Sequence, residues 1–185
     1  MKKSYFMALA LFFFSTTVFA GDFTLSSPQL KESGRLGMDQ VFSGFGCTGK
    51  NISPALEWKG APESTKSFAV TVYDPDAPTG SGWWHWVIFN IPAGVHSLPT
   101  NAGNVAAGLA PKGSVQSMTD FGKPGYGGAC PPKGDKAHRY QFTVFALDVE
   151  KLPLKASAPG AMVGFFLNQH VLGKATLTAS FSRAK

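Results

Sequence analysis

Residues 74–78 read Asp-Pro-Asp-Ala-Pro, and residues 83–86, after a short loop of small residues, read Trp-Trp-His-Trp. The two prolines fix φ at their own positions and bias the preceding residues toward extended geometry. The two aspartates therefore project from a stiff turn. Because β-branched and aromatic residues fill the chain on both sides, the stretch predicts a β-rich fold with polar side chains at the ends of strands.

Other interpretations of this turn are open. Asp-x-Asp also begins a calcium-binding EF-hand loop, but the next oxygen position is Pro78, and no glutamate follows at the required spacing. A turn that only joins two strands is the simpler alternative. A cis bond before either proline would make the turn tighter.

A second proline-led stretch has the same design. Residues 127–132 read Gly-Gly-Ala-Cys-Pro-Pro, and the apolar run that follows opens on His138, Arg139 and Tyr140. Because side chains alternate along a strand, the histidine and tyrosine share one face, and the arginine points to the other, where it can pair with a carboxylate inside the fold. If this run and residues 84–91 are neighbours in one sheet, the polar side chains of both motifs converge at one rim.

The converging side chains suit a small anion. Imidazole, phenol hydroxyl and backbone N–H groups all donate hydrogen bonds to a phosphate-like oxygen. The Asp74 carboxylate repels an anion, so it is expected to fix a histidine tautomer or to accept a hydrogen bond from a protonated phosphate or an ammonium group. Protonation of His85 or His138 would strengthen anion binding from about pH 8 to about pH 6. Nearby aromatic residues could supply an apolar wall: Trp83, Trp84, Trp86, Phe121 and Tyr126.

Three strong strand patterns indicate a mainly β domain. Residues 67–73, 84–91 and 139–147 are rich in β-branched and aromatic residues, and 67–73 is apolar on both faces, which is typical of a central strand. Apolar residues at helical spacing predict one helix over 160–172, with Gly173 as a stop. We therefore expect a Greek-key-like antiparallel sandwich with one late helix.

Weaker patterns complete the expected fold. Further strands are predicted at residues 23–25, 39–42, 176–181 and, as a proline-interrupted edge strand, 51–58. Other segments are expected to be loops: a surface connection at 97–114 with a helical turn near 104–109, and a Gly/Pro-rich functional loop at 119–136.

The first residues have the composition of a secretory signal peptide. Two lysines precede an apolar run over residues 5–14, which is too short to span a membrane, and residues 18–20 read Val-Phe-Ala, which suits signal peptidase. We expect residues 1–20 to be removed and residues 21–185 to form a single domain in the periplasm or outside the cell. An uncleaved N-terminal anchor is the alternative.

Cysteine usage agrees with export. The chain has two cysteines, Cys47 and Cys130, each in a Gly-rich, loop-like context. An even number in an oxidising compartment favours a disulfide, which would stabilise the fold by roughly 4–5 kcal/mol in the chain-entropy model. A zinc site is the rival interpretation, but neither cysteine has a second one close by in the sequence.

The charge distribution gives little support to nucleic-acid binding. The formal net charge is +6, but no block of five or more like charges occurs. No segment after the signal peptide is long and apolar enough to span a bilayer. The sequence predicts neither a cofactor nor a metal site.

The two motifs together resemble the signature regions of the phosphatidylethanolamine-binding protein family. The residues that carry the resemblance are DPDAP followed by WHW, and ACPPKGDKAHRYQF at residues 129–142. The match is closest to the exported bacterial branch, described as Raf-kinase-inhibitor-like, and runs from about Phe23 to Phe181. It departs at Cys130, where other branches carry glycine, and at the compact loop 79–82, so animal kinase partners are not carried over.

The resemblance implies a large antiparallel sheet packed on a smaller one, a C-terminal helix and an anion-binding cavity at one end. It implies phosphate-like groups, phosphorylethanolamine or simple anions as ligands. The family's pocket positions fall on eight residues: Asp74, Pro78, Trp83, His85, Cys130, Pro131, His138 and Tyr140.

We therefore expect an exported, non-enzymatic protein that holds a small anion or phosphorylated head group and regulates a partner protein. One alternative is a serine-protease inhibitor that acts through an exposed loop within residues 97–136. A phosphoester-acting enzyme is less favoured, because no serine or cysteine nucleophile is marked by the sequence. The protein partner and the oligomeric state, a homodimer included, are left open.

Overall fold

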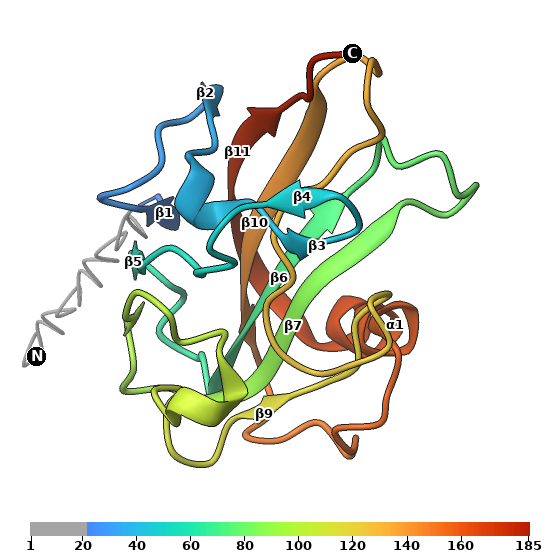
Figure 1. The fold of residues 1–185 in the computed structure, drawn as a ribbon. Helices are drawn as coiled ribbons and strands as arrows, with labels where there is room; N and C mark the ends of the chain where they lie inside the picture. Colours follow the sequence, from blue (N-terminus) through green and yellow to red (C-terminus); the bar gives the residue numbers. More distant parts are fainter. Residues whose placement is uncertain (1–21) are drawn as a thin grey trace, which may run out of the picture.

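Four long strands form the centre of a six-stranded sheet in the computed structural model, which describes residues 22–185 (Figure 1). They are β6 (Ser67–Asp74), β7 (Trp83–Pro92), β10 (His138–Leu147) and β11 (Val171–Phe181). The short strands β2 (Gly34–Arg35) and β9 (Val115–Gln116) lie at the edges, and the order is β2-β11-β10-β6-β7-β9. The predicted signal peptide lies outside the described residues.

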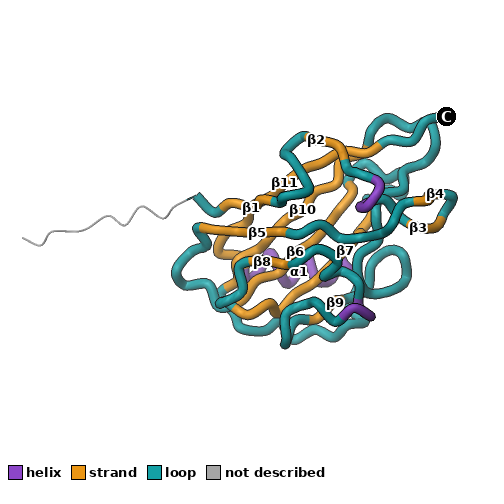
Figure 2. The backbone as a smooth tube through the Cα atoms, turned by 60° about the vertical axis from the view of Figure 1, so that its left-hand side comes forward, coloured by secondary structure: helices purple, strands orange, loops and turns teal. Residues whose placement is uncertain are grey.

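A second layer covers one face of this sheet. The strands β1 (Thr24–Ser26), β5 (Leu56–Lys59) and β8 (Ser97–Leu98) form a three-stranded antiparallel sheet, which Figure 2 shows in front of the larger one. Leu56 and Trp58 of β5 are buried in the cluster between the layers, where the indole packs against Phe68. The predicted arrangement of a large sheet on a smaller one is confirmed.

The helix α1 (Gly160–His170) covers the opposite face of the large sheet (Figure 2). Val163 and Leu167 are buried there against apolar residues of β6 and β7. Trp84 lies so close to the helix that a Cβ at Gly160 would overlap with the indole, so glycine permits the close packing of strand and helix. In the part of the chain that the structure describes, no helix is long and apolar enough to cross a membrane.

A small hairpin lies at the same end of the molecule as the C-terminus (Figure 2). Its strands are β3 (Ser43–Gly44) and β4 (Cys47–Thr48). The chain just before it, at Val41, forms an isolated bridge with Ala129. The hairpin therefore lies beside the second proline-led motif, far away in sequence.

Two of the weaker strand predictions are wrong in part. Residues 39–42 do not form a strand: Met38–Gln40 is the 3-10 helix η1, because the Gln40 N–H bonds back to the Gly37 carbonyl. The segment 51–58 becomes a strand only from Leu56, and this strand is central in its sheet because β1 and β8 pair with its two edges. Pro54 lies before the paired residues, so it does not confine the strand to an edge.

The end of the predicted helix is also wrong. The helix stops at His170, and β11 begins at the next residue rather than at 176. Gly173 is part of this strand and lies opposite Ala146 of β10. Pairing with β10 takes these residues into the sheet, which local helical spacing cannot anticipate. The helical turn predicted near 104–109 is present as η2 (Val105–Ala107), whereas β8 and β9 were not predicted.

Candidate ligand-binding site

The two proline-led motifs meet at one end of the large sheet, although their strands are not neighbours as we expected. The strand β6 lies between β7 and β10 and is antiparallel to both. Consequently β7 and β10 both start at the end where β6 finishes at Asp74. The strand β6 therefore places Asp74 between β7, which carries His85, and β10, which carries His138.

A cavity of about 220 Å³ opens at this end. It is lined by all eight residues that the sequence analysis assigned to the pocket: Asp74, Pro78, Trp83, His85, Cys130, Pro131, His138 and Tyr140. Five more residues line it: Phe45, Ala77, Thr79, Phe121 and Pro132. The polar side chains of Asp74, His85, His138 and Tyr140 are buried, whereas Phe45 is exposed. The cavity therefore has a polar floor and an apolar mouth.

A β-bulge aims His85 into the cavity. Tyr73 pairs with Trp84 and Val72 pairs with Trp86, so His85 is the extra residue on β7 and has no partner on β6. Such a bulge changes which face a side chain takes. Trp84 accordingly packs toward the helix, while His85 lies on the cavity side. The sequence predicted both side chains at the strand start but not this division between them.

Asp74 holds His138 in one orientation. The His138 Nδ1 lies 2.8 Å from the Asp74 Oδ2, and both side chains are almost completely buried. A carboxylate oxygen can only accept, so Nδ1 carries the proton. The other Asp74 oxygen accepts the Asp76 N–H at 2.8 Å. The second ring nitrogen, Nε2, remains for other partners, with the exposed Asp135 carboxylate 3.5 Å away.

His85 is held by a backbone carbonyl instead of a carboxylate. Its Nδ1 donates to the Gly127 carbonyl over 2.7 Å. Burial lowers the pKa of His85 below its ordinary value, and the carbonyl of Gly127 and the charge of Asp74 oppose this shift only in part. The ring is therefore neutral at neutral pH, and its Nε2 offers a lone pair. Of the two histidines, His85 is thus an unsuitable source of positive charge for an anion.

Tyr140 contributes a hydroxyl without an internal partner. The side chain is 1% exposed, and its OH donates to no described residue, although the backbone N–H of Cys130 lies on the oxygen side of the phenol. Burial and the nearby Asp74 raise the pKa of Tyr140, so the phenol stays protonated. Buried hydroxyl groups are normally hydrogen-bonded, and an unpaired one in a cavity indicates a ligand position.

Asp76 and Arg139 stabilise the rim but are not part of the cavity lining. The Arg139 Nε and Nη2 atoms lie 2.8 and 2.9 Å from the two Asp76 carboxylate oxygens, and the Arg139 N–H also donates to Asp76. The bonded guanidinium lowers the pKa of Asp76 far below its usual range. The predicted carboxylate partner of Arg139 thus lies at the rim and belongs to the first motif.

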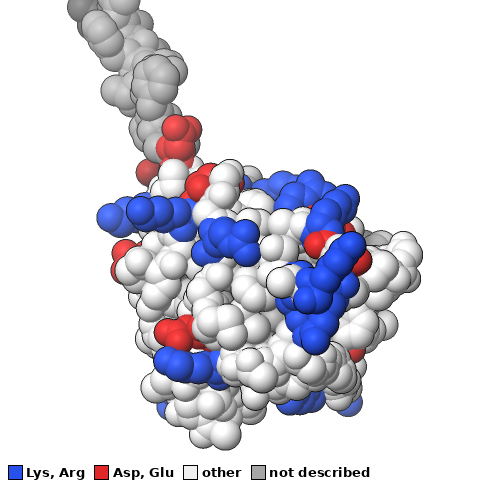
Figure 3. Space-filling view, turned by 45° about the horizontal axis from the view of Figure 1, so that its top comes forward, with Lys and Arg blue, Asp and Glu red and all other residues white. Residues whose placement is uncertain are grey.

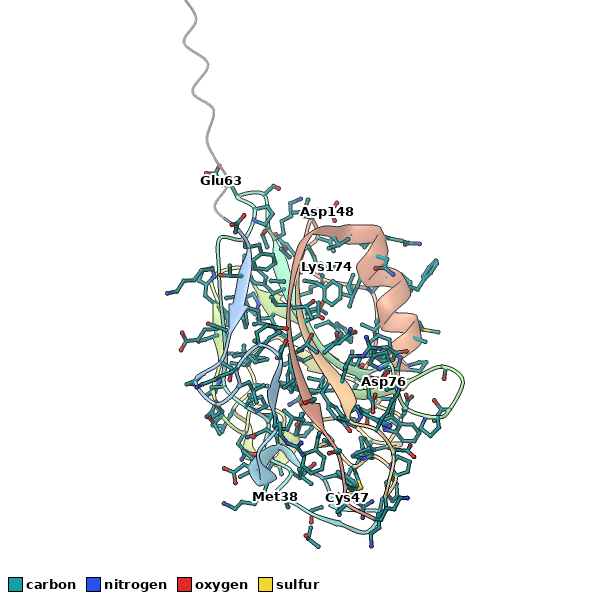
Figure 4. The ribbon with its side chains drawn as sticks, turned by 90° about the horizontal axis from the view of Figure 1, so that it is seen from above. Met38, Cys47, Glu63, Asp76, Asp148 and Lys174 are labelled. Atoms are coloured by element: carbon teal, nitrogen blue, oxygen red, sulfur yellow. A yellow bond between two sulfur atoms is a disulfide. The ribbon has the colours of Figure 1, made fainter. Side chains whose placement is uncertain are left out.

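The predicted disulfide joins Cys47 of the hairpin to Cys130 of the second motif. The yellow sulfur atoms lie beside Cys47 in Figure 4, at the end of the molecule opposite Glu63. Arg183 also ties these two segments together: its Nη2 donates to the Gly46 carbonyl at 2.6 Å and its Nη1 to the Pro131 carbonyl at 3.3 Å. The hairpin is therefore fixed beside the cavity.

The apolar wall differs from the one expected. Trp83 and Phe121 line the cavity, and their rings meet edge to face. Trp84 packs toward the helix, Trp86 is in the core with its Nε1 bonded to Gln116, and the Tyr126 hydroxyl donates to the Gln40 carbonyl.

The described residues contain no cis peptide bond, so Pro75 and Pro78 of the first motif both follow trans bonds.

Basic side chains cover more of the surface at this end of the molecule than acidic ones do (Figure 3). The face in Figure 3, with the top of Figure 1 turned forward, carries more Lys and Arg surface than Asp and Glu surface. Lys136 and Arg139 flank Asp76, and Arg183 contacts the cavity-lining Pro131. A positive rim raises the local concentration of anions.

The fold and site define a two-layered β domain with a small, partly polar cavity at the ends of its central strands. The family model described as "Phosphatidylethanolamine-binding protein" matches residues 26–182. The chain therefore belongs to the phosphatidylethanolamine-binding protein family.

Individual relatives agree with this assignment. The chain is 52% identical over 176 residues to the UPF0098 protein YbcL of Escherichia coli, covering 95% of this chain and 96% of the relative. It is also 52% identical to the E. coli UPF0098 protein YbhB over 158 residues, covering 85% of this chain and 99% of that protein.

Solved structures are similar as well. The crystal structure of E. coli YbcL, described as a new member of the mammalian PEBP family, aligns with a TM-score of 0.85 and 54% identity, covering 86% of this chain and 98% of that chain. A phosphatidylethanolamine-binding protein homologue from Chlamydia trachomatis aligns with a TM-score of 0.72 and 26% identity, covering 87% of this chain and 97% of that chain.

Proposed function

We propose that this protein is an exported, non-enzymatic binding protein that holds a small phosphate-like anion or phosphorylated head group in the cavity. The observation that carries the proposal is the Tyr140 hydroxyl, a buried donor with no internal partner on the cavity floor. His138 and His85 line the same floor, and a monoprotonated phosphate could donate to the neutral imidazole of His85.

The surroundings support an anionic ligand. The basic rim attracts anions from solution. Asp74 is engaged with His138 and Asp76 through both of its oxygens, so its charge is partly compensated before a ligand arrives. The family's name suggests that the anion is the phosphate of a head group.

The test is calorimetric titration of inorganic phosphate into the wild-type protein and Tyr140→Phe. The variant should bind about tenfold more weakly, because it loses one hydrogen bond to a charged ligand. Phe142→Leu, in the same strand but outside the cavity lining, is the control and should bind as the wild type does. Equal affinity of Tyr140→Phe and wild type would contradict the assignment of this hydroxyl.

A phosphoester-acting enzyme is the second candidate, because the paired Asp74 and His138 with the nearby His85 form an acid–base set. We favour binding because the cavity lining contains no free nucleophilic cysteine: Cys130 is in the disulfide. Incubation with p-nitrophenyl phosphate should release no nitrophenol above a His138→Ala control. Release that depends on His138 would favour the enzyme.

The proposed export rests on the N-terminal composition and is compatible with the disulfide. We also propose that occupancy of the cavity alters binding to a partner protein.

A further inference from the structure

Phe45 at the tip of the β3–β4 hairpin has two unfavourable features. Its side chain is 71% exposed, the highest exposure among the large apolar residues of the described chain. Its φ is 51°, in the left-handed region that large side chains seldom adopt. Neither feature stabilises the free protein, and glycine would suit this turn position better.

The position of Phe45 is nevertheless fixed by several contacts. The disulfide at Cys47 and the Arg183 bond to Gly46 hold the residues that follow it. Its ring lies against two other phenylalanines, with centroids 5.4 Å from Phe42 and 5.8 Å from Phe121. The hairpin therefore presents this aromatic ring at a defined place.

That place is the mouth of the cavity. Phe45 and Phe121 both line it, and the Phe121 ring also meets the His85 ring with centroids 5.3 Å apart. A row of rings thus leads from the exposed hairpin tip down to the polar floor. A ligand whose phosphate rests on the floor would place its next group against these rings.

We propose that Phe45 is a specificity-determining residue that selects phosphate esters carrying an apolar group next to the phosphate, in preference to inorganic phosphate. The inference rests on the proposed function, because the phosphate must bind at the floor. An aryl or alkyl group beside Phe45 and Phe121 would bury apolar surface that is otherwise exposed. An aromatic group would in addition form offset or edge-to-face pairs with the rings.

The experiment compares two probes, phenyl phosphate and inorganic phosphate, by calorimetric titration into the mature protein. The wild type should bind phenyl phosphate roughly tenfold more tightly. Phe45→Gly should reduce this preference, measured as the ratio of the two affinities, roughly three- to tenfold. Because glycine adopts the φ of this turn without strain, the variant should fold, and a melting curve checks this.

Two control variants isolate the ring at the cavity mouth. Phe45→Tyr keeps the ring and should keep the preference. Phe165→Ala removes a phenylalanine that is 61% exposed on α1 and does not line the cavity, and it should also keep the preference. Loss of the preference in Phe165→Ala would indicate a nonspecific surface effect and overturn the inference.

The outcomes separate this inference from the proposed function. If inorganic phosphate binds but phenyl phosphate binds no more tightly, the inference is wrong and the anion site stands. If the preference exists but survives Phe45→Gly, another residue determines it and the inference is again wrong. If neither probe binds, the proposed function and the inference are both overturned.

A further arm identifies the source of the ester. Vesicles of phosphatidylcholine with and without phosphatidic acid are sedimented with the wild type and with Phe45→Gly. Phosphatidic-acid-dependent, Phe45-dependent binding would support a lipid head group as the ester. Preference for phenyl phosphate without vesicle binding would support a soluble ester, with the same role for Phe45.

Discussion

Asp74 is the residue whose role in an anion site needs most explanation, because its charge opposes the ligand. The structure shows it bonded to the His138 ring on one oxygen and to the Asp76 N–H on the other. The first bond fixes the histidine tautomer and leaves Nε2 for other partners. This geometry agrees with one of the two roles that the sequence left open for Asp74, the orientation of His138, and we propose that role.

The variant Asp74→Asn tests this role. It keeps the shape but places either an amide N–H or a weaker acceptor opposite the His138 Nδ1, so the ring loses its orientation. Phosphate affinity should fall about tenfold despite the removal of a negative charge. The measurement is calorimetric titration at neutral pH, with melting curves to separate weaker binding from unfolding.

Asp135→Asn is the matched control for Asp74→Asn. It also removes one negative charge near the His138 ring, but from an exposed side chain 3.5 Å from Nε2. It should leave phosphate affinity unchanged or increase it slightly, because only repulsion is removed. Tighter binding in Asp74→Asn would show that Asp74 merely repels anions.

The lowered pKa of His85 predicts a pH-dependent stability. The folded state binds this proton less readily than the unfolded state, so acidification below about pH 6.5, the ordinary histidine value, favours unfolding. Between about pH 7 and about pH 5 this group should lower the free energy of unfolding by at most about 2 kcal/mol. This fall in the free energy of unfolding should be smaller in His85→Gln than in the wild type. Urea denaturation of the ligand-free protein at the two pH values measures it.

The exposed His96 supplies the control for this pH dependence. His96→Gln should show the same change between the two pH values as the wild type. A wild-type dependence retained in full by His85→Gln would mean that another group accounts for it. Because its pKa is lowered, His85 is uncharged at neutral pH. Any strengthening of anion binding as the pH falls toward neutrality should therefore be attributed to another group.

At the scale of elements, the loop from Pro75 to Gly82 determines where β7 begins. Gly82 has φ 69°, and a Cβ there would overlap with the Tyr73 hydroxyl and lie 2.7 Å from the Asp74 carbonyl oxygen. The Tyr73 hydroxyl in turn donates to the Ser81 carbonyl. Glycine thus permits the close return of the chain that places Trp83 opposite Asp74.

Gly82→Ala should therefore destabilise the fold by about 2–4 kcal/mol, because backbone strain is added to a steric clash. Gly80→Ala is the matched control, since Gly80 also has a positive φ, 77°, but a Cβ there would contact nothing within 4 Å. It should cost only about 1 kcal/mol. Urea denaturation measures both, and equal losses would refute the importance of the close approach at Gly82.

At the scale of the whole molecule, the disulfide and the predicted signal peptide both bear on whether the protein is exported. Cys47 and Cys130 lie in segments that contact one another only in the folded chain. Their bond fixes the hairpin beside the cavity, and such a bond is compatible with export to an oxidising compartment. The domain assigned to residues 21–185 and the cleavage after Ala20 stay predictions.

Export predicts a shortened chain. N-terminal sequencing of the protein recovered from outside the cytoplasm should begin at Gly21, and the full-length precursor should be found only inside. Ala20→Leu enlarges a position where signal peptidase requires a small residue, so this variant should stay uncleaved. Phe19→Leu, at the neighbouring position that tolerates large side chains, is the matched control and should be cleaved normally. An exported wild-type protein that begins at Met1 would contradict the prediction.

The sequence by itself determined that the domain is mainly β, and that polar residues stand at the ends of particular strands. Alternating and β-branched runs over 67–73, 84–91 and 139–147 are local patterns, and the structure has strands there. The eight site positions were implied by the resemblance of the two motifs to a known family, and all eight line one cavity.

The tertiary structure alone decided which strands lie side by side and which side chains share the cavity. That β6 lies between β7 and β10, and that β11 begins directly after His170, depend on pairing between distant segments. The bulge at His85 arises from the register with β6, and Phe45 reaches the cavity only through the hairpin held by Cys130 and Arg183. Such contacts join residues far apart in the chain, so no local pattern encodes them.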